Sequence, residues 1–166
     1  MITMAIDASS KSTGIAIFKD KELVHYECIA ATGDDSLARI KKMAAEIKKI
    51  YETWKATNVI MEDVIPSDVH NNQVVFNTLH YLQAAIVLML HDYKQKVEFY
   101  VSSTWRSKCG IRTGRGITRD MVKAADIKFV KDNYNLDVND DIADAICIGY
   151  AYTHPKTSPA ARESAF

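Results

Sequence analysis

Four acidic residues of this chain lie beside apolar segments, where a carboxylate is unexpected. Asp7 ends the first apolar run, and Glu62 lies within another. Asp141 and Asp144 lie in a segment that is otherwise almost wholly apolar. A charge is costly to bury unless something binds it. Four acids in one place need divalent cations, and hard oxygen ligands select Mg²⁺ or Mn²⁺ rather than zinc.

The chemistry that such a site serves is two-metal cleavage of a phosphodiester. Two ions, roughly 3.5–4 Å apart, generate the attacking hydroxide and clamp the phosphate oxygens. Our hypothesis is that Asp7 bridges two Mg²⁺ ions, for which Mn²⁺ substitutes. The catalytic and metal-binding set is then completed by Glu62, Asp141 and Asp144.

Each of these acids also has a simpler interpretation as a helix cap or a solvated side chain. Asp141 falls in the first turn of a predicted helix, where the helix dipole favours an acid. Asp63 and Asp140 stand directly beside candidate ligands. Alternation along the strand must decide between Glu62 and Asp63. The set of four, rather than any single acid, indicates a site.

Hydrophobic periodicity predicts the elements that must position these acids. The predicted strands are 2–8, 14–19, 23–30, 58–65 and 97–101. Four helices are predicted. The first begins at an N-cap Asp34 or Asp35, and the second spans 72–93. The third begins after Thr118, and the fourth spans about 141–152, with Asn139 or Asp140 as its N-cap. Three strands followed by alternating helices and strands predict an α/β fold. Its mixed five-stranded sheet has three antiparallel strands and then two parallel ones, flanked by helices.

The composition is that of an ordinary globular protein. Of 166 residues, 48% are hydrophobic and 25% charged, and the formal net charge is +0. We expect one domain over 1–154 and a flexible tail over 155–166. The most apolar run, 84–90, is too short to span a bilayer. The three cysteines are widely spaced, which favours reduced thiols in a cytoplasm.

A basic segment follows the fifth predicted strand. Residues 102–123 contain six basic residues, three glycines and one acid, in a chain without net charge. This local excess predicts a track for a DNA backbone, although a solvated positive loop is the alternative. We assign the neighbouring Trp105 to packing rather than to base stacking. The predicted DNA-binding residues are Arg106, Lys108, Arg112, Arg115, Arg119 and Lys123.

Three short motifs carry a family resemblance. They are Ile6-Asp7-Ala8-Ser9 followed by Thr13-Gly14, then Ile60-Met61-Glu62-Asp63, and finally Asp141-Ile142-Ala143-Asp144-Ala145. The chain resembles the RuvC-type Holliday junction resolvases of the RNase H-like superfamily. It is most similar to the small versions carried by phages of Gram-positive bacteria. Order and spacing of the motifs agree from about residue 2 to residue 154.

The resemblance implies an RNase H-like fold and a structure-specific endonuclease. Such an enzyme resolves four-way junctions and other branched DNA in recombination and repair, using Mg²⁺ and paired nicks. It also implies a homodimer to which the second long helix contributes, and a phage-encoded protein in a bacterial cytoplasm. By this resemblance, Arg106 takes the place of a basic residue near the scissile phosphate. Arg119 stands for a second such residue.

Two departures from the family and three competing functions accompany this interpretation. Ala8-Ser9 replaces a proline-glycine pair, and Ile65 stands where cellular members place an aromatic residue that helps to open the junction. The alternatives are a ribonuclease acting on RNA–DNA hybrids, a non-catalytic junction-binding protein and an actin-like phosphotransferase. The last needs two lobes and a much longer chain. Dimerisation would distinguish a resolvase from a ribonuclease H.

Overall fold

A computed structural model describes residues 1–66, 72–90 and 96–155 of the protein. Ten elements follow one another along these residues. They are β1 (Ile2–Asp7), β2 (Ser12–Lys19), β3 (Glu22–Ala30), α1 (Ser36–Trp54), β4 (Asn58–Glu62), α2 (Gln73–Met89), β5 (Lys96–Tyr100), α3 (Ser102–Cys109), α4 (Arg119–Tyr134) and α5 (Asp140–Thr153).

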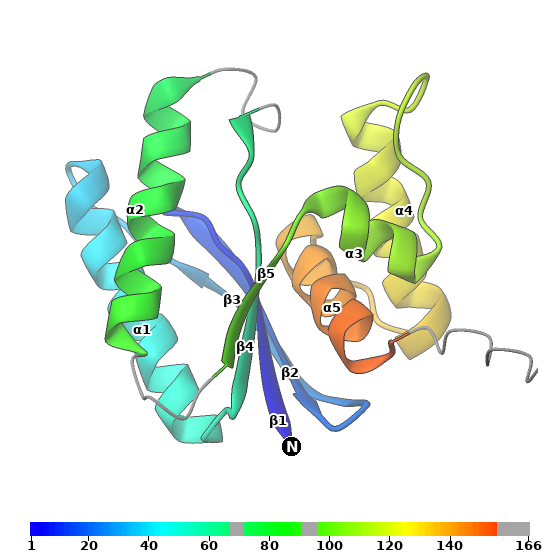
Figure 1. Ribbon diagram of the computed structural model, residues 1–166, viewed down its shortest axis with the longest axis horizontal. Coiled ribbons are helices and arrows are strands. Elements are labelled where there is room, and N and C mark those ends of the chain that lie inside the picture. The colour runs from blue at the N-terminus through cyan, green and yellow to red at the C-terminus, as the bar shows by residue number, and fades with distance from the viewer. Residues whose placement is uncertain (67–71, 91–95, 156–166) are drawn as a thin grey trace, which may run out of the picture.

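The five strands form one mixed sheet in the order β3-β2-β1-β4-β5 (Figure 1). β2 pairs antiparallel with both β1 and β3, whereas β4 pairs parallel with both β1 and β5. The predicted sheet is therefore confirmed. Because β1 and β4 are parallel neighbours at its centre, their carboxyl ends lie at the same edge of the sheet.

Helices cover both faces of the sheet, α1 and α2 on one side and α3, α4 and α5 on the other (Figure 1). Side chains of a strand alternate between faces. Met4 and Ile6 of β1 therefore pack in the core on the α1–α2 side, whereas Ala5 packs in the core on the α5 side. β4 follows the same pattern, with Met61 on the first side and Ile60 on the second.

Two glycines let α5 lie directly on the sheet. A Cβ atom added at Gly14 of β2 would lie 1.9 Å from the carbonyl oxygen of Asp141. One added at Gly149 of α5 would lie 2.3 Å from the ring of Phe18. Neither position has room for a larger residue without movement of the backbone or a buried ring. The start of α5 is thereby brought onto the central strands.

The structure differs from the sequence-based expectation mainly at the end of β4 and directly after β5. The strand predicted over 58–65 ends at Glu62, whose register partner is the last residue of β5. The basic segment after β5 begins with the helix α3, which ends at Cys109 and is followed by the C-cap Gly110 with a φ of 78°. Eight residues are too few to show a clear helical stripe, so α3 was not predicted.

Side-chain caps decide the helix starts that the sequence left open. Asp35 caps α1, and Asn139, not Asp140, caps α5. Thr118 caps α4, as predicted. The predicted end of the second helix at 91–93 lies outside the described residues, as does the predicted tail from 156 onward. None of the described helices has the length and apolar character needed to cross a membrane.

Candidate active site

Two of the candidate acids lie at the carboxyl ends of the central parallel strands. The last paired residues of β1 and β4 are Ile6 and Met61, so Asp7 and Glu62 follow at the same level. Alternation places both acids on the α5 side of the sheet, because the residues two positions earlier pack there. The same alternation assigns Glu62, rather than Asp63, to that side.

The other two candidate acids lie on the first turns of α5. Asp141 and Asp144 are three residues apart and therefore share one face of the helix. In the antiparallel register of β1 and β2, Asp7 is the partner of Gly14. Since Gly14 admits the Asp141 backbone, the start of α5 passes over the end of β1. The four acids line one cleft of about 570 Å³, and Asp63, the residue after β4, lines it too.

The acids are held in a strongly unfavourable electrostatic environment. Burial, together with the charges of Glu62 and Asp141, raises the pKa of Asp7 to about 8. Burial and the charges of Asp7 and Asp126 raise the pKa of Asp144 to about 9. Opposing charges from nearby cations only partly offset these shifts. The cleft therefore has less positive charge than its carboxylates need.

The donor set fits a hard divalent cation. The Oδ1 atom of Asp144 is buried and has no hydrogen-bond partner among the described residues. Carboxylate oxygens are the ligands that Mg²⁺ and Mn²⁺ prefer. Among the described residues, no three His, Cys, Asp or Glu side chains are gathered tightly enough to hold a metal ion as they stand.

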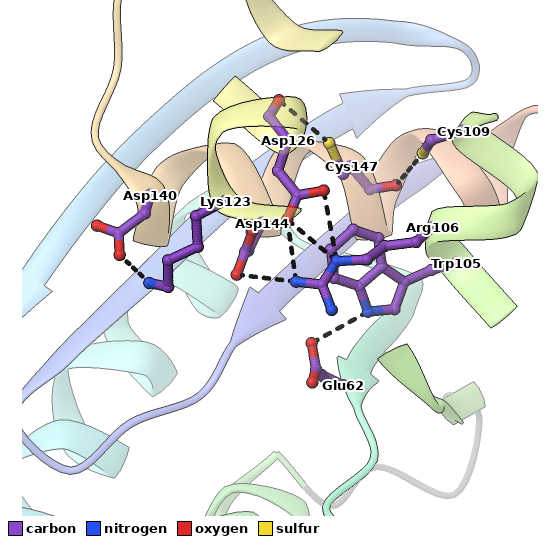
Figure 2. A network of polar contacts seen from close by, with 9 residues as sticks. All are labelled: Glu62, Trp105, Arg106, Cys109, Lys123, Asp126, Asp140, Asp144 and Cys147. Carbon is purple, nitrogen blue, oxygen red and sulfur yellow. Dashed lines mark hydrogen bonds and ion pairs between the residues drawn. The ribbon is translucent and has the colours of Figure 1, made fainter. Parts of the chain in front are cut away.

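Two neutral side chains hold carboxylates of the site, and the sequence did not predict either contact. The indole Nε1 of Trp105 donates a hydrogen bond of 3.0 Å to Oε2 of Glu62 (Figure 2). Trp105 is fully buried, as its assignment to packing predicted. The hydroxyl of Ser12 donates to Oδ2 of Asp141. Both donors come from elements that meet the acids only in the folded chain.

The six predicted DNA-binding residues divide into two groups. Arg106, Arg119 and Lys123 line the cleft that holds the acids. Lys123 also forms an ion pair with Asp140 (Figure 2). The remaining three, Lys108, Arg112 and Arg115, do not line the cleft. The Lys108 ammonium lies 4.0 Å from the ring centroid of Tyr100, and the other two are exposed between α3 and α4.

Arg106 is the most deeply placed of these cations. Its side chain is 12% exposed and is ion-paired with Asp126 and Asp144. Burial opposes its charge, but the hydrogen bond and charge of Asp126 outweigh this effect and raise the pKa of Arg106. Sequence reasoning missed Asp126, although a signal was present. The acid lies midway between Val122 and Val130, four residues from each, on the apolar face of α4.

Comparisons with known proteins find a family model and several solved structures that match this chain. The family model described as "Crossover junction endodeoxyribonuclease RuvC" matches residues 3–154. Thermus thermophilus RuvC, solved with a Holliday junction substrate, has a TM-score of 0.71 and 13% identity, with 91% of each chain covered. Fowlpox virus resolvase, solved with Holliday junction DNA, has a TM-score of 0.60 and 16% identity, with 92% of this chain and 97% of that chain covered.

A third similar structure is the yeast mitochondrial Holliday junction resolvase. Its TM-score is 0.57 at 13% identity, with 91% of this chain and 77% of that chain covered. No curated relative matches the sequence. The predicted RNase H-like fold and the predicted enzyme class, a DNA endonuclease of four-way junctions, are confirmed. The chain belongs to the RuvC family of crossover junction endodeoxyribonucleases.

Proposed function

We propose that residues 1–154 act as one nuclease domain that hydrolyses phosphodiesters of four-way DNA junctions with paired nicks. The observation that carries this proposal is the cleft, in which four carboxylates from β1, β4 and α5 face Arg119 and Lys123 of α4. A bound phosphate is negatively charged and needs cationic groups beside it. The four carboxylates repel one another and need cations between them. The same cleft can satisfy both needs when divalent ions are present.

The proposed metal ligands are Asp7, Glu62, Asp141 and Asp144, holding two Mg²⁺ ions that Mn²⁺ can replace. When bound, such ions lower the pKa of a coordinated water and neutralise charge on the phosphate. The central position of Asp7 supports a bridging role. The charges of Glu62 and Asp141 both act on Asp7, and Asp7 in turn acts on Asp144. Trp105 and Ser12 would orient two of these ligands by their hydrogen bonds.

The proposed DNA track begins at the cleft and continues over the basic segment. Arg106, Arg119 and Lys123 lie in the cleft, where they can contact the phosphate that is cut. Arg112 and Arg115 are exposed on the connection between α3 and α4 and can contact neighbouring phosphates. Glycines with positive φ on this connection bring the backbone close to a ligand without a side chain in the way.

We propose a homodimer formed through α2. Val74, Tyr81 and Leu88 are spaced by seven residues and are 75%, 57% and 75% exposed. A seven-residue apolar repeat is typical of a helix that packs against another helix. Two copies joined in this way would present two clefts to two opposed strands. Leu88→Asp should give a monomer in sedimentation, whereas the exposed Leu37→Asp on α1 should not.

We also propose that the enzyme is phage-encoded and acts in a bacterial cytoplasm. Its three cysteines, Cys28, Cys109 and Cys147, are free, as expected in a reducing compartment. The proposed substrate would then be branched DNA formed when phage genomes recombine or are repaired.

The experiment that tests the proposed function is cleavage, with Mg²⁺, of a labelled four-way junction beside a linear duplex and an RNA–DNA hybrid. Symmetric paired nicks confined to the junction are expected. Cutting of the hybrid alone would show a ribonuclease instead. Tight junction binding without cutting at any Mg²⁺ or Mn²⁺ concentration would show a non-catalytic binding protein.

A further inference from the structure

A buried acid outside the proposed metal ligands lies against the cleft. Asp126 of α4 is fully buried, and its neighbours on the same helix face are Val122 and Val130. A buried carboxylate is costly unless it is paired and hydrogen-bonded. The metal-binding proposal gives Asp126 no part. Its presence in an apolar face therefore calls for a separate explanation.

The partner of Asp126 is the guanidinium of Arg106 on α3 (Figure 2). The Nε and Nη2 atoms of Arg106 both lie 3.0 Å from Oδ2 of Asp126. Nη2 also lies 3.5 Å from Oδ2 of Asp144. The Cζ atom lies 4.0 Å from the centroid of the Trp105 ring. Arg106 is thus held by one ion pair at hydrogen-bond distance, one longer ion pair and one aromatic face.

At these distances, Arg106 makes its short contact with Asp126 and only a longer ion pair with Asp144. The closer carboxylate is that of Asp126, and Oδ1 of Asp144 has no hydrogen-bond partner among the described residues. If Asp126 lost its charge, the acids left near the guanidinium would be those of the cleft. Arginine forms short two-pronged contacts with a carboxylate. It would then move onto Asp144 and compete with any metal ion there.

We propose that Asp126 is a positioning residue. It anchors Arg106 so that the guanidinium points into the cleft while the carboxylate of Asp144 stays open to a divalent cation. The inference rests on the proposed function, because it takes Asp144 as a metal ligand. It assigns to Asp126 a role in metal affinity that does not require contact with the metal.

The test measures Mn²⁺ affinity by calorimetry without DNA, in wild type, Asp126→Asn, Arg106→Gln and the double variant. Groups that hold the surroundings of a metal site typically change affinity by roughly 10–100-fold when altered. We expect Asp126→Asn to weaken Mn²⁺ binding within that range. The double variant should regain affinity, because the competing guanidinium is gone. Asp132→Asn, an exposed acid on the same helix paired with Lys128, is the matched control and should bind Mn²⁺ as wild type does.

A second measurement follows the unaltered protein by NMR and uses one variant only to assign a resonance. Arg106→Gln identifies the Arg106 Nε–H resonance in the NMR spectrum. We expect that resonance to persist when Mg²⁺ is added, since Asp126 keeps its hydrogen bond. Its loss on Mg²⁺ binding would show that Arg106 leaves Asp126 and would overturn the inference.

The outcomes separate this inference from the proposed function. If wild type neither binds Mn²⁺ nor cuts junctions, both proposals fall. If wild type does both, and Asp126→Asn binds Mn²⁺ equally well, only the role of Asp126 falls. A double variant that binds as weakly as Asp126→Asn would also overturn it, because Asp126 would then act independently of Arg106.

Discussion

The two walls of the cleft are built in opposite ways. The acidic wall consists of two strand ends and the first turns of α5, and register and close packing determine its residues. The basic wall consists of α3, α4 and the connection between them. Its cations range from Arg106, at 12% exposure, to Arg112 and Arg115 on the exposed connection. The properties of the acidic wall depend on the exact positions of its side chains. Those of the exposed part of the basic wall depend on charge alone.

The physical reason for this difference is solvation. A carboxylate removed from water interacts strongly with its neighbours, so its exact distance to them sets its pKa. An exposed arginine acts on DNA through a field that salt screens over roughly 8–10 Å. Small shifts of such an arginine matter little. Changes to the acidic wall should therefore have large local effects, and changes to the exposed basic residues should have small, additive ones.

The largest effect is expected for Asp7→Asn, at the centre of the acidic wall. Loss of this ligand should lower cleavage by roughly 10³-fold or more, the upper end of what one electrostatic stabiliser provides. Junction binding should persist, because the change removes negative charge. Cleavage assays and gel-shift titrations on the same junction measure the two effects. Undiminished cleavage would exclude Asp7 as a bridging ligand.

Gly14→Ala should damage the same wall without touching a carboxylate. The new Cβ would lie 1.9 Å from the Asp141 carbonyl oxygen, so the start of α5 must shift. We expect the free energy of unfolding to fall by about 3 kcal/mol or more, with loss of cleavage. Urea denaturation measures the change. Gly33→Ala, whose nearest contact would be 3.1 Å, is the control and should cost less.

Trp105→Phe should separate packing from hydrogen bonding in the acidic wall. The ring is largely kept, but Glu62 loses the indole N–H that lies 3.0 Å from it. A drop in cleavage of roughly 10–100-fold is expected, together with a higher Mg²⁺ requirement. The control is Trp54→Phe on the opposite side of the sheet. Equal effects of the two changes would argue against an orienting role for Trp105.

Stability of the metal-free protein should depend on pH through the acidic wall. In the unfolded chain Asp7 and Asp144 ionise near 3.8, whereas folding raises these pKa values to about 8 and about 9. Between these limits the folded state binds more protons than the unfolded state, so stability should fall as pH rises and level off above them. Denaturation in a chelating buffer at several pH values tests this. Asp144→Asn should flatten the slope, and an unchanged slope would contradict the shifts.

The smallest effects are expected on the exposed part of the basic wall. Arg112→Gln and Arg115→Gln should each weaken junction binding modestly and reduce the salt dependence of binding by about one ion. The cleavage rate at saturating junction should change little. Binding titrations at several salt concentrations provide the measurement, with Lys21→Gln in the β2–β3 turn as the control. A large loss of cleavage rate would instead show that these arginines act directly in cleavage.

The sequence was most informative where periodicity links neighbouring residues. Alternation and helical spacing indicated which acids share a face, and the structure places all four of them in one cleft. The sequence was least informative about contacts between distant elements. The pairing of Asp126 with Arg106 and of Trp105 with Glu62 depends on how α3 and α4 pack on the sheet. The short α3 itself carried no clear pattern.

Most of the elements along the chain, the mixed character of the sheet, the acid-bearing segments and the local excess of positive charge could all be predicted from the sequence. These properties arise from hydrophobic periodicity and composition, which neighbouring residues express directly. Packing between distant elements sets which cation is buried, which carboxylates accept hydrogen bonds from neutral donors and which carboxylate oxygen has no hydrogen-bond partner among the described residues. Those outcomes depend on distances of a few ångströms between elements far apart in the chain. Away from water, each of these contacts has a larger electrostatic energy.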